Sequence, residues 1–116
     1  MIFGTWRFVA FGNSDGTTRT AKPEVSDCDD CYVITFREDT IMVGKSVFNI
    51  LGKRFTLSEN QLSFPGGVLS TAVGEIGDGY LFTEALRNVH SFKIEKSRLK
   101  LYYTGNKFLL FNPKNE

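Results

Sequence analysis

The fold of this chain is decided by the stretch Asp78-Gly79-Tyr80-Leu81-Phe82-Thr83-Glu84-Ala85-Leu86-Arg87-Asn88-Val89 and by the C-terminal segment after it. Within the stretch, apolar side chains recur at positions 81, 82, 85, 86 and 89, which is the spacing of one helical face. From His90 onward the apolar period changes to two, in three runs: Phe92 and Ile94; Leu99, Leu101 and Tyr103; Phe108 and Leu110. A period of two is typical of β-strands. The last third therefore predicts one amphipathic helix and then a three-stranded β-meander.

The chain before this stretch is predicted to form short strands separated by turns. We expect strands at residues 6–11, 31–36, 40–43, 48–50, 54–57, 61–64 and 68–73. Residues 51–53 are expected to form a tight bend, and residues 17–30 a long polar loop. The length of 116 residues suits one domain. We therefore predict a single domain over residues 1–116, with about eight or nine strands and one helix.

So many short strands in a small domain favour an antiparallel β-barrel-like meander, because closure removes exposed sheet edges. Eleven Phe, four Tyr and one Trp agree with a mainly β chain. The helix has a single apolar stripe, so we expect it to pack over a gap in the barrel, with Asp78 as its N-cap. The run from 107 to 112 is apolar on both faces, and we expect an extra layer, the helix or the Trp6 segment, over its second face.

The charge pattern argues against several partner classes. The net charge is +1, so there is no overall attraction to DNA, RNA or an anionic membrane. Residues 87–116 contain seven Lys/Arg and residues 15–39 contain seven Asp/Glu. The simplest interpretation is solvated outer faces, and the alternative is a basic face that meets an acidic partner or a phospholipid head group. No apolar run is long enough for a transmembrane helix.

Several short motifs succeed one another across nearly the whole chain. They are Gly4-x-Trp6; Thr35-Phe36; Asn49-x-x-Gly52-x-x-Phe55; Leu62-Ser63-Phe64; Ser70-Thr71; Phe82-Thr83-Glu84-Ala85-Leu86; and Leu99-Lys100-Leu101. Their order and spacing resemble the META domain (HslJ-like) family. Val73, Glu75 and Gly79 depart from the family's residues at the matching positions, so the chain resembles a divergent member.

This resemblance implies a small β-barrel-like fold with one helix packed on it. The family is common among bacterial exported proteins and lipoproteins, is associated with stress response, and carries no established enzyme chemistry. We therefore predict a non-enzymatic protein of the bacterial cell envelope, in the periplasm or anchored to the outer membrane as a lipoprotein. The chain begins with Met1 and enters a predicted strand directly, which fits a cytoplasmic protein as well as an exported one whose signal lies outside this sequence.

The segment Asp27-Cys28-Asp29-Asp30-Cys31 is the most suggestive local cluster. A redox-active Cys-x-x-Cys normally lies at a helix N-terminus, where the helix dipole lowers the thiol pKa, whereas this pair leads into a predicted strand. A metal site would need further ligands, and the chain has no second Cys/His pair. We favour a disulfide between Cys28 and Cys31, or two plain thiols. A disulfide would imply an oxidising compartment and would add little stability, because its loop is very short.

Other residues give no pattern of catalysis. His90 is the single histidine, and the sequence contains no Gly-x-Ser-x-Gly nucleophile motif. The glycines at 74, 77 and 79 precede a helix, but the βαβ unit and the Lys-Ser/Thr of a phosphate-binding loop are missing. We therefore predict no catalytic residue, no cofactor and no metal ligand.

Two functions remain for such a domain. The first is a binding or structural module that meets a protein or envelope component through a sheet face, or through the loops at 12–30 and 65–79. The alternative is a lipocalin-like carrier of a small apolar ligand inside the barrel, since larger barrels can enclose ligands. In that case we expect the ligand to be lined by Trp6, Phe36, Phe82 and Leu101.

Overall fold

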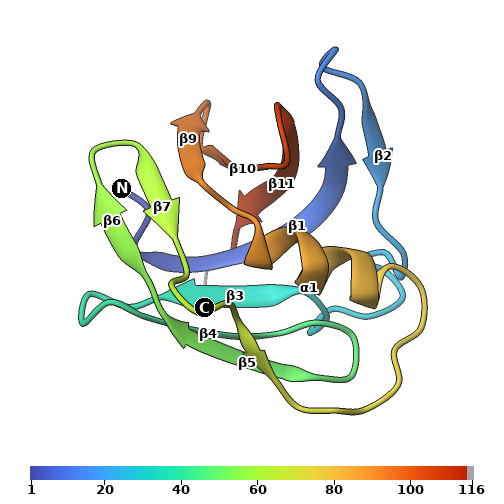
Figure 1. The fold of residues 1–116 in the computed structure, drawn as a ribbon. Helices are drawn as coiled ribbons and strands as arrows, with labels where there is room; N and C mark the ends of the chain where they lie inside the picture. The colour runs from blue at the N-terminus through green and yellow to red at the C-terminus, as the bar shows by residue number, and fades with distance from the viewer. Residues whose placement is uncertain (115–116) are drawn as a thin grey trace.

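The computed structural model describes residues 1–114, which form eleven β-strands and one α-helix (Figure 1). The strands are β1 (Gly4–Gly12), β2 (Thr18–Thr20), β3 (Val33–Phe36), β4 (Ile41–Lys45), β5 (Ile50–Arg54), β6 (Thr56–Ser58), β7 (Gln61–Ser63), β8 (Leu69–Ser70), β9 (Ser91–Glu95), β10 (Arg98–Tyr103) and β11 (Lys107–Pro113). The helix α1 (Gly79–Arg87) lies between β8 and β9 in the chain. The predicted mainly β fold with one helix is confirmed.

The strands form one antiparallel sheet that curls into an open, barrel-like shape (Figure 1). Their order is β6-β7-β9-β10-β11-β1-β3-β4-β5-β8, and β2 pairs with the end of β1 outside this path. The two edges of the curl are therefore β6 and β8. One buried residue, Phe55, connects β5 to β6, so the chain itself links the two sides of the open curl.

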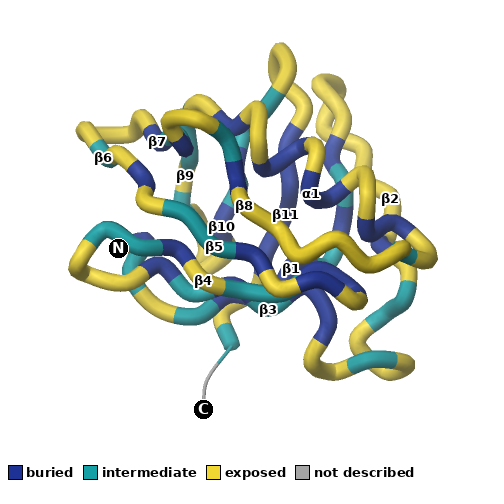
Figure 2. Tube along the Cα trace, turned by 60° about the horizontal axis from the view of Figure 1, so that its bottom comes forward, coloured by how far each residue is buried: buried dark blue, intermediate teal, exposed yellow. Residues whose placement is uncertain are grey.

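Helix α1 packs inside this curl, against the concave side of the sheet (Figure 1). The ring centroid of Phe82 lies 4.7 Å from that of Phe8 on β1 and 6.3 Å from that of Phe111 on β11. Ala85 and Leu86 are also buried, and buried and exposed residues alternate along the helix in Figure 2. Burial of this apolar stripe is what holds the helix in place. Within residues 1–114, no helix is long and apolar enough to cross a membrane.

A β-bulge in β1 brings Phe8 and Phe11 to the same face of the sheet although they are three residues apart. The register of β1 against β11 shifts between Phe8 and Ala10. A bulge adds one residue to a strand and so changes which side chains share a face. Phe8 and Phe11 consequently meet in the main core, with ring centroids 4.9 Å apart.

The last strand, β11, is buried on both faces as predicted, but by different means. Its inward side chains lie in the main core beneath α1, whereas Phe108 and Leu110 form a second, smaller cluster with Ala10 of the neighbouring strand. The Lys100 ammonium lies 4.8 Å from the centroid of the Phe108 ring and covers it. The expectation that α1 covers this face is therefore wrong, whereas the Trp6 segment contributes Val9 and Ala10 as a neighbouring strand of the same sheet. Side chains of adjacent strands bury it.

The predicted bend at residues 51–53 is also wrong. Gly52 lies in the middle of β5, opposite Val43 of β4 on one side and Leu69 of β8 on the other. Glycine permits a turn without requiring one, and pairing with two neighbouring strands keeps this segment extended.

Other element boundaries also differ from expectation: the strand expected at 31–36 begins at Val33, residues 48–49 lie outside β5, and Phe55 interrupts the strand expected at 54–57. Residues 18–20 lie within the predicted loop, yet they form β2 because β1 is long enough to pair with them. The strand expected over 68–73 is limited to Leu69–Ser70. Beyond it, the Asn49 side chain takes the hydrogen bonds that a neighbouring strand would make.

Candidate binding groove

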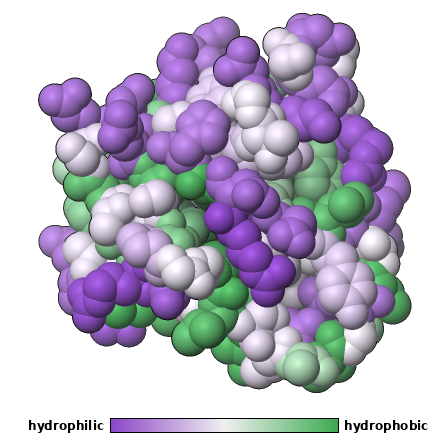
Figure 3. All heavy atoms as spheres, viewed as in Figure 1, coloured by the Kyte–Doolittle hydropathy of each residue, from purple (hydrophilic) through white to green (hydrophobic). Residues whose placement is uncertain are grey.

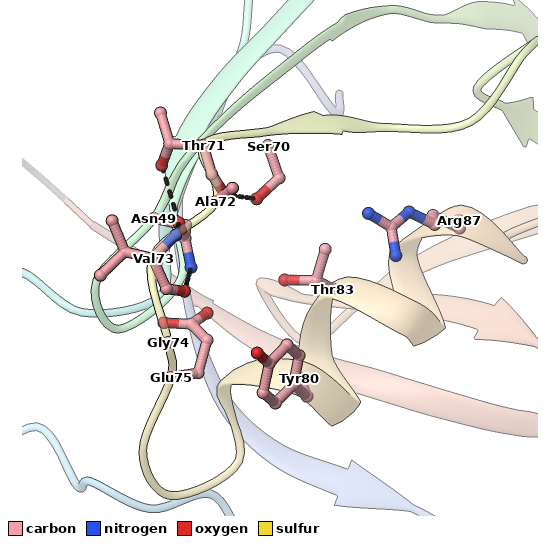
Figure 4. Close-up of a pocket in the computed structure, with 10 residues that line it drawn as sticks. All are labelled: Asn49, Ser70, Thr71, Ala72, Val73, Gly74, Glu75, Tyr80, Thr83 and Arg87. Atoms are coloured by element: carbon pink, nitrogen blue, oxygen red, sulfur yellow. Dashed lines mark hydrogen bonds between the residues drawn. The ribbon is translucent and has the colours of Figure 1, made fainter.

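A surface hollow of about 330 Å³ separates β8 and the segment after it from one side of α1 (Figure 4). We call it the β8–α1 groove. It is lined by Asn49, Ser70, Thr71, Ala72, Val73, Gly74, Glu75, Tyr80, Thr83 and Arg87. Residues 70–75 form one wall, and the helix forms the other.

The buried side chain of Asn49 holds the first wall in place. Its Oδ1 accepts hydrogen bonds from the Thr71 hydroxyl and the Val73 amide, each 2.8 Å long, and its Nδ2 donates to the Val73 carbonyl at 2.7 Å (Figure 4). A single amide side chain thus makes three hydrogen bonds to a segment that has left the sheet. This wall is therefore ordered without a ligand, which lowers the entropy cost of binding.

Glu75 fixes the same wall to the rest of the domain. Its carboxylate accepts hydrogen bonds from the Phe48 amide, at 2.8 Å, and from the Ser46 hydroxyl. The carboxyl group also lies against the start of α1, since a Cβ built on Gly79 would be 2.7 Å from it. Glycine at position 79 therefore makes room for Glu75. This contact sets the position of the wall relative to the helix.

The helix wall is formed by Tyr80, Thr83 and Arg87, whose spacing places them on one helical face. Tyr80 is 69% exposed, and the Thr83 hydroxyl donates to the Gly79 carbonyl at 3.1 Å. Arg87 approaches the carboxylate of Glu84 only to 4.0 Å, and such exposed pairs are weak. Its guanidinium can therefore bind an anionic group in the groove.

Exposed apolar side chains are concentrated in one part of the sequence. Of the ten large hydrophobic residues exposed within the described part of the chain, seven come from positions 48–81: Phe48, Ile50, Leu69, Val73, Ile76, Tyr80 and Leu81. The face drawn in Figure 3 shows hydrophobic groups along its lower part, interleaved with hydrophilic ones. Of these seven residues, Val73 and Tyr80 line the groove and give it an apolar component.

Asp78 occupies the predicted N-cap position of α1, and its carbonyl accepts a hydrogen bond from the Phe82 amide at 2.9 Å, but its side chain makes no hydrogen bond to the helix. Its carboxylate instead accepts hydrogen bonds from both terminal nitrogens of Arg19, at 3.0 and 3.2 Å, and from the Lys22 amide at 2.8 Å. The Tyr32 hydroxyl donates to the Lys22 carbonyl at 2.6 Å, and burial raises the pKa of this phenol. These contacts anchor the 18–32 segment to the start of the helix. The phenol stays protonated and serves as a donor.

Cys28 and Cys31 form a disulfide in this structure, which is one of the two alternatives that the sequence left open. The side chain of Arg7, only 6% exposed, donates to the Cys28 carbonyl at 2.7 Å and to the Phe8 carbonyl at 3.1 Å. Burial lowers the pKa of Arg7, against the opposing influence of Tyr32 and nearby carboxylates. The two sulfurs and an Asp30 oxygen lie within 4.8 Å of one another, but bonded sulfurs are not the thiolates that a metal requires. The cluster therefore has a structural role, tying its loop to β1.

The four residues expected to line a carrier cavity, Trp6, Phe36, Phe82 and Leu101, lie in the main hydrophobic core. Other rings pack closely around two of them: Phe82 is surrounded by rings at centroid distances from 4.7 Å, and the ring centroid of Phe36 lies 5.2 Å from that of Phe55. None of the four lines the β8–α1 groove. These contacts favour a packed core at this place over a ligand-filled space.

His90 lies at the surface just after α1. Its Nε2 is 3.2 Å from the Gly105 carbonyl oxygen, and its Nδ1 is 3.0 Å from the Ser91 hydroxyl. These neighbours orient the ring between the helix and the turn after β10. The group opposite the Ser91 hydroxyl is a main-chain carbonyl and not the carboxylate that orients the histidine of a triad.

Sequence reasoning pointed to the loop at 65–79 as a contact region, and this loop contains the groove wall 70–75, but it identified neither Asn49 nor the helix wall. Asn49 stood out only as part of a family motif, and Tyr80 and Arg87 only as polar positions of the helix. The signal that could have found them is the polar face of the helix at positions 80, 83 and 87. Placing that face beside β8 requires the tertiary structure.

The fold and groove together define a class: small, mainly β, barrel-like domains with one helix in the open curl. No protein-family model matches this chain, and no curated protein sequence matches it significantly. An NMR structure of a protein from Burkholderia xenovorans is similar over 97% of this chain and 83% of its own, with a TM-score of 0.76 and 20% identity. The crystal structure of a DUF4847 family protein from Bacteroides vulgatus is similar over 99% and 95%, with a TM-score of 0.69 and 15% identity. At these identities the similarity shows the fold.

Proposed function

We propose that this protein is a non-enzymatic binding module of the bacterial cell envelope, related to META domain (HslJ-like) proteins, and that it binds its partner in the β8–α1 groove. The observation that carries the proposal is the groove itself. Asn49 and Glu75 order one wall without a ligand, while Tyr80 and Arg87 present exposed groups from the other. Ordered walls with exposed binding groups are what a recognition surface needs.

The envelope location is supported by the disulfide between Cys28 and Cys31. Disulfides persist in oxidising compartments such as the bacterial periplasm and are rare in the cytosol. The barrel-like fold with a single packed helix also agrees with the fold that the META resemblance implies. These two features support an exported protein.

Site-specific photo-crosslinking tests the binding function. A photoreactive amino acid replaces Tyr80 in the groove or, as a control, exposed Thr17 in the turn between β1 and β2. Each protein is irradiated with envelope extract from the organism that carries the gene. We expect a defined adduct from position 80 that excess unmodified protein competes away, and no such adduct from position 17. Equal labelling from both positions, or none from position 80, would contradict the proposal.

A further inference from the structure

We propose that the β8–α1 groove binds an extended peptide segment that adds a strand to the edge of β8 and places a carboxylate against Arg87. This inference rests on the binding function proposed above and names the chemistry of its partner. Three observations carry it: the free edge of β8, the ordered wall that presents this edge to the groove, and the charge of the groove.

The first observation is the unpaired edge of β8. The Thr71 amide donates to the Ile50 carbonyl at 3.1 Å, and Leu51 is paired with Ser70. Because hydrogen-bonded and non-hydrogen-bonded pairs alternate along an antiparallel ladder, the amide and carbonyl of Ser70 point away from β5. By the same alternation, the main-chain amide and carbonyl of Ala72 also point away from β5. Within residues 1–114, no strand lies beyond β8 to pair with them.

These outward groups face the groove, since Ser70 and Ala72 both line it. Ser70 and Ala72 are separated by one residue, and both direct their main-chain amide and carbonyl outward. This spacing matches the hydrogen-bonding repeat of an incoming strand. Asn49 keeps the second of them in place, because it binds the residues on both sides, Thr71 and Val73. The edge is thus a preformed template for an extended chain.

The charge of the groove selects a carboxylate. Arg87 is the one cation and Glu75 the one anion among the lining residues. Both oxygens of Glu75 already accept hydrogen bonds from Phe48 and Ser46, whereas Arg87 has only a distant contact with Glu84. The available charge is therefore positive, and guanidinium binds carboxylate with two parallel hydrogen bonds. A carboxylate at a peptide C-terminus or on an Asp or Glu side chain supplies the same chemistry.

The test uses the full chain and a pool of random heptapeptides in two forms. One form has a free C-terminal carboxylate, and the other is amidated and carries one fixed Asp. Binders are identified by affinity selection and measured singly by fluorescence anisotropy. The ¹H–¹⁵N spectrum of the labelled protein then locates the binding site. We expect selected peptides to shift the amides of Ser70 and Ala72, and the better form to show which source of carboxylate is preferred.

Two matched pairs of variants separate the contribution of the outward Ser70 amide from that of the Arg87 charge. Ser70→Pro removes the outward amide while keeping the bonds to β5, and Ser70→Ala keeps the amide. We expect Ser70→Pro to weaken binding at least about tenfold and Ser70→Ala to change it less than about twofold. Arg87→Gln is expected to weaken binding about tenfold, but only for peptides that retain the carboxylate. Arg37→Gln, on a distant turn, is the charge control. Circular dichroism confirms that each variant is folded.

Several results would overturn the inference. The pool could contain no peptide that binds with a dissociation constant below about 1 mM, or the binders could shift only amide signals of residues outside the groove. Equal peptide affinity of the Ser70→Pro and Ser70→Ala proteins would overturn it as well. A concentration-dependent dimer, seen by light scattering and abolished by Ser70→Pro, would assign the edge to a second copy and would also overturn it. If crosslinking at position 80 still captures a partner in these cases, the proposed function stands and only the peptide inference fails.

Discussion

At the scale of single residues, the glycines show how closely the strands pack. A Cβ built on Gly44 of β4 would lie 2.5 Å from the Ile34 side chain, 2.7 Å from the Val33 carbonyl oxygen and 2.9 Å from the Ile34 Cα. A Cβ built on Gly52 of the adjacent strand would meet its nearest atom at 3.7 Å, which is ordinary contact. The two positions are neighbours in the sheet and differ in the space they allow.

Gly44→Ala is therefore expected to destabilise the protein by about 1–3 kcal/mol, because main-chain atoms of β3 must move to admit the methyl group. Gly52→Ala is the matched control, and its unfolding free energy should stay within about 0.5 kcal/mol of the parent. Urea unfolding monitored by tryptophan fluorescence measures both. Equal losses in the two variants would show that strand geometry, and not the close contact, decides the effect.

At the scale of elements, the 18–32 segment is tied to the sheet by bonds of different kinds. Arg7 binds its main chain, the Cys28–Cys31 disulfide closes it locally, and Lys45 at the end of β4 donates to Asp30 at 2.9 Å. Only the disulfide was visible as a candidate in the sequence. The other two ties depend on which strands lie beside the segment.

Removing the disulfide with Cys28→Ala and Cys31→Ala together should lower the unfolding free energy by no more than about 2 kcal/mol, because the closed loop is very short. The variant should keep its circular dichroism spectrum, since Arg7 still holds this loop. In the parent, mass spectrometry with alkylation should label both cysteines only after reduction. Free thiols in protein purified from the periplasm would contradict the disulfide, and an unfolded double variant would contradict its minor role.

The contact between Lys45 of β4 and Asp30 depends on pH. The hydrogen bond and charge of Lys45 lower the pKa of Asp30 from its ordinary 3.8. A depressed pKa in the folded state means that this contact contributes stability above the ordinary pKa and loses it as the pH falls through the folded value. Lys45→Met should therefore raise the pKa of Asp30, as measured by ¹³C NMR of its carboxyl group. Lys107→Met should leave it unchanged, and a shift with that variant would point to general charge effects.

At the scale of the whole molecule, the curl of the sheet is closed by α1 and filled by aromatic rings. Rings from β1, β11 and the helix meet at Phe82, and its neighbours Phe8, Tyr32 and Phe111 are all buried. The carrier alternative requires this space to open for an apolar ligand. Close packing of this kind makes opening costly, because each displaced ring loses its contacts.

We therefore expect N-phenylnaphthylamine, an apolar fluorescent probe, to show no saturable enhancement with the native protein. Phe82→Ala removes one large ring from the core and should leave a cavity, at a cost of about 3–5 kcal/mol. If this variant remains folded, it should bind the probe and provide the positive control. Saturable binding by the parent, competed by fatty acids, would favour the carrier function over the groove.

Much of the fold was predictable from local pattern. The helix, the meander after it and the turns at Lys96-Ser97 and Thr104-Gly105-Asn106 arise from apolar period and turn residues, and the structure has all of them. The bend at 51–53 failed because pairing on both sides of β5 decides the conformation of Gly52. Asp78 lies at the predicted N-cap position, but its carboxylate does not cap the helix because it binds Arg19, 59 residues away in sequence.

The sequence by itself thus determined which elements the domain contains: a period switch that specifies one helix and the strands after it, in a mainly β chain. It left the Cys-x-x-Cys open between a disulfide and two plain thiols. Periodicity reports which face of an element is buried, so these features need no knowledge of neighbours. Only the tertiary structure decided the β8–α1 groove. Asn49 and Glu75 fix its first wall by hydrogen bonds between residues 48–49 and residues 73–75, which are more than 20 residues apart in the chain. A site of this kind depends on contacts between distant segments, and no local pattern records them.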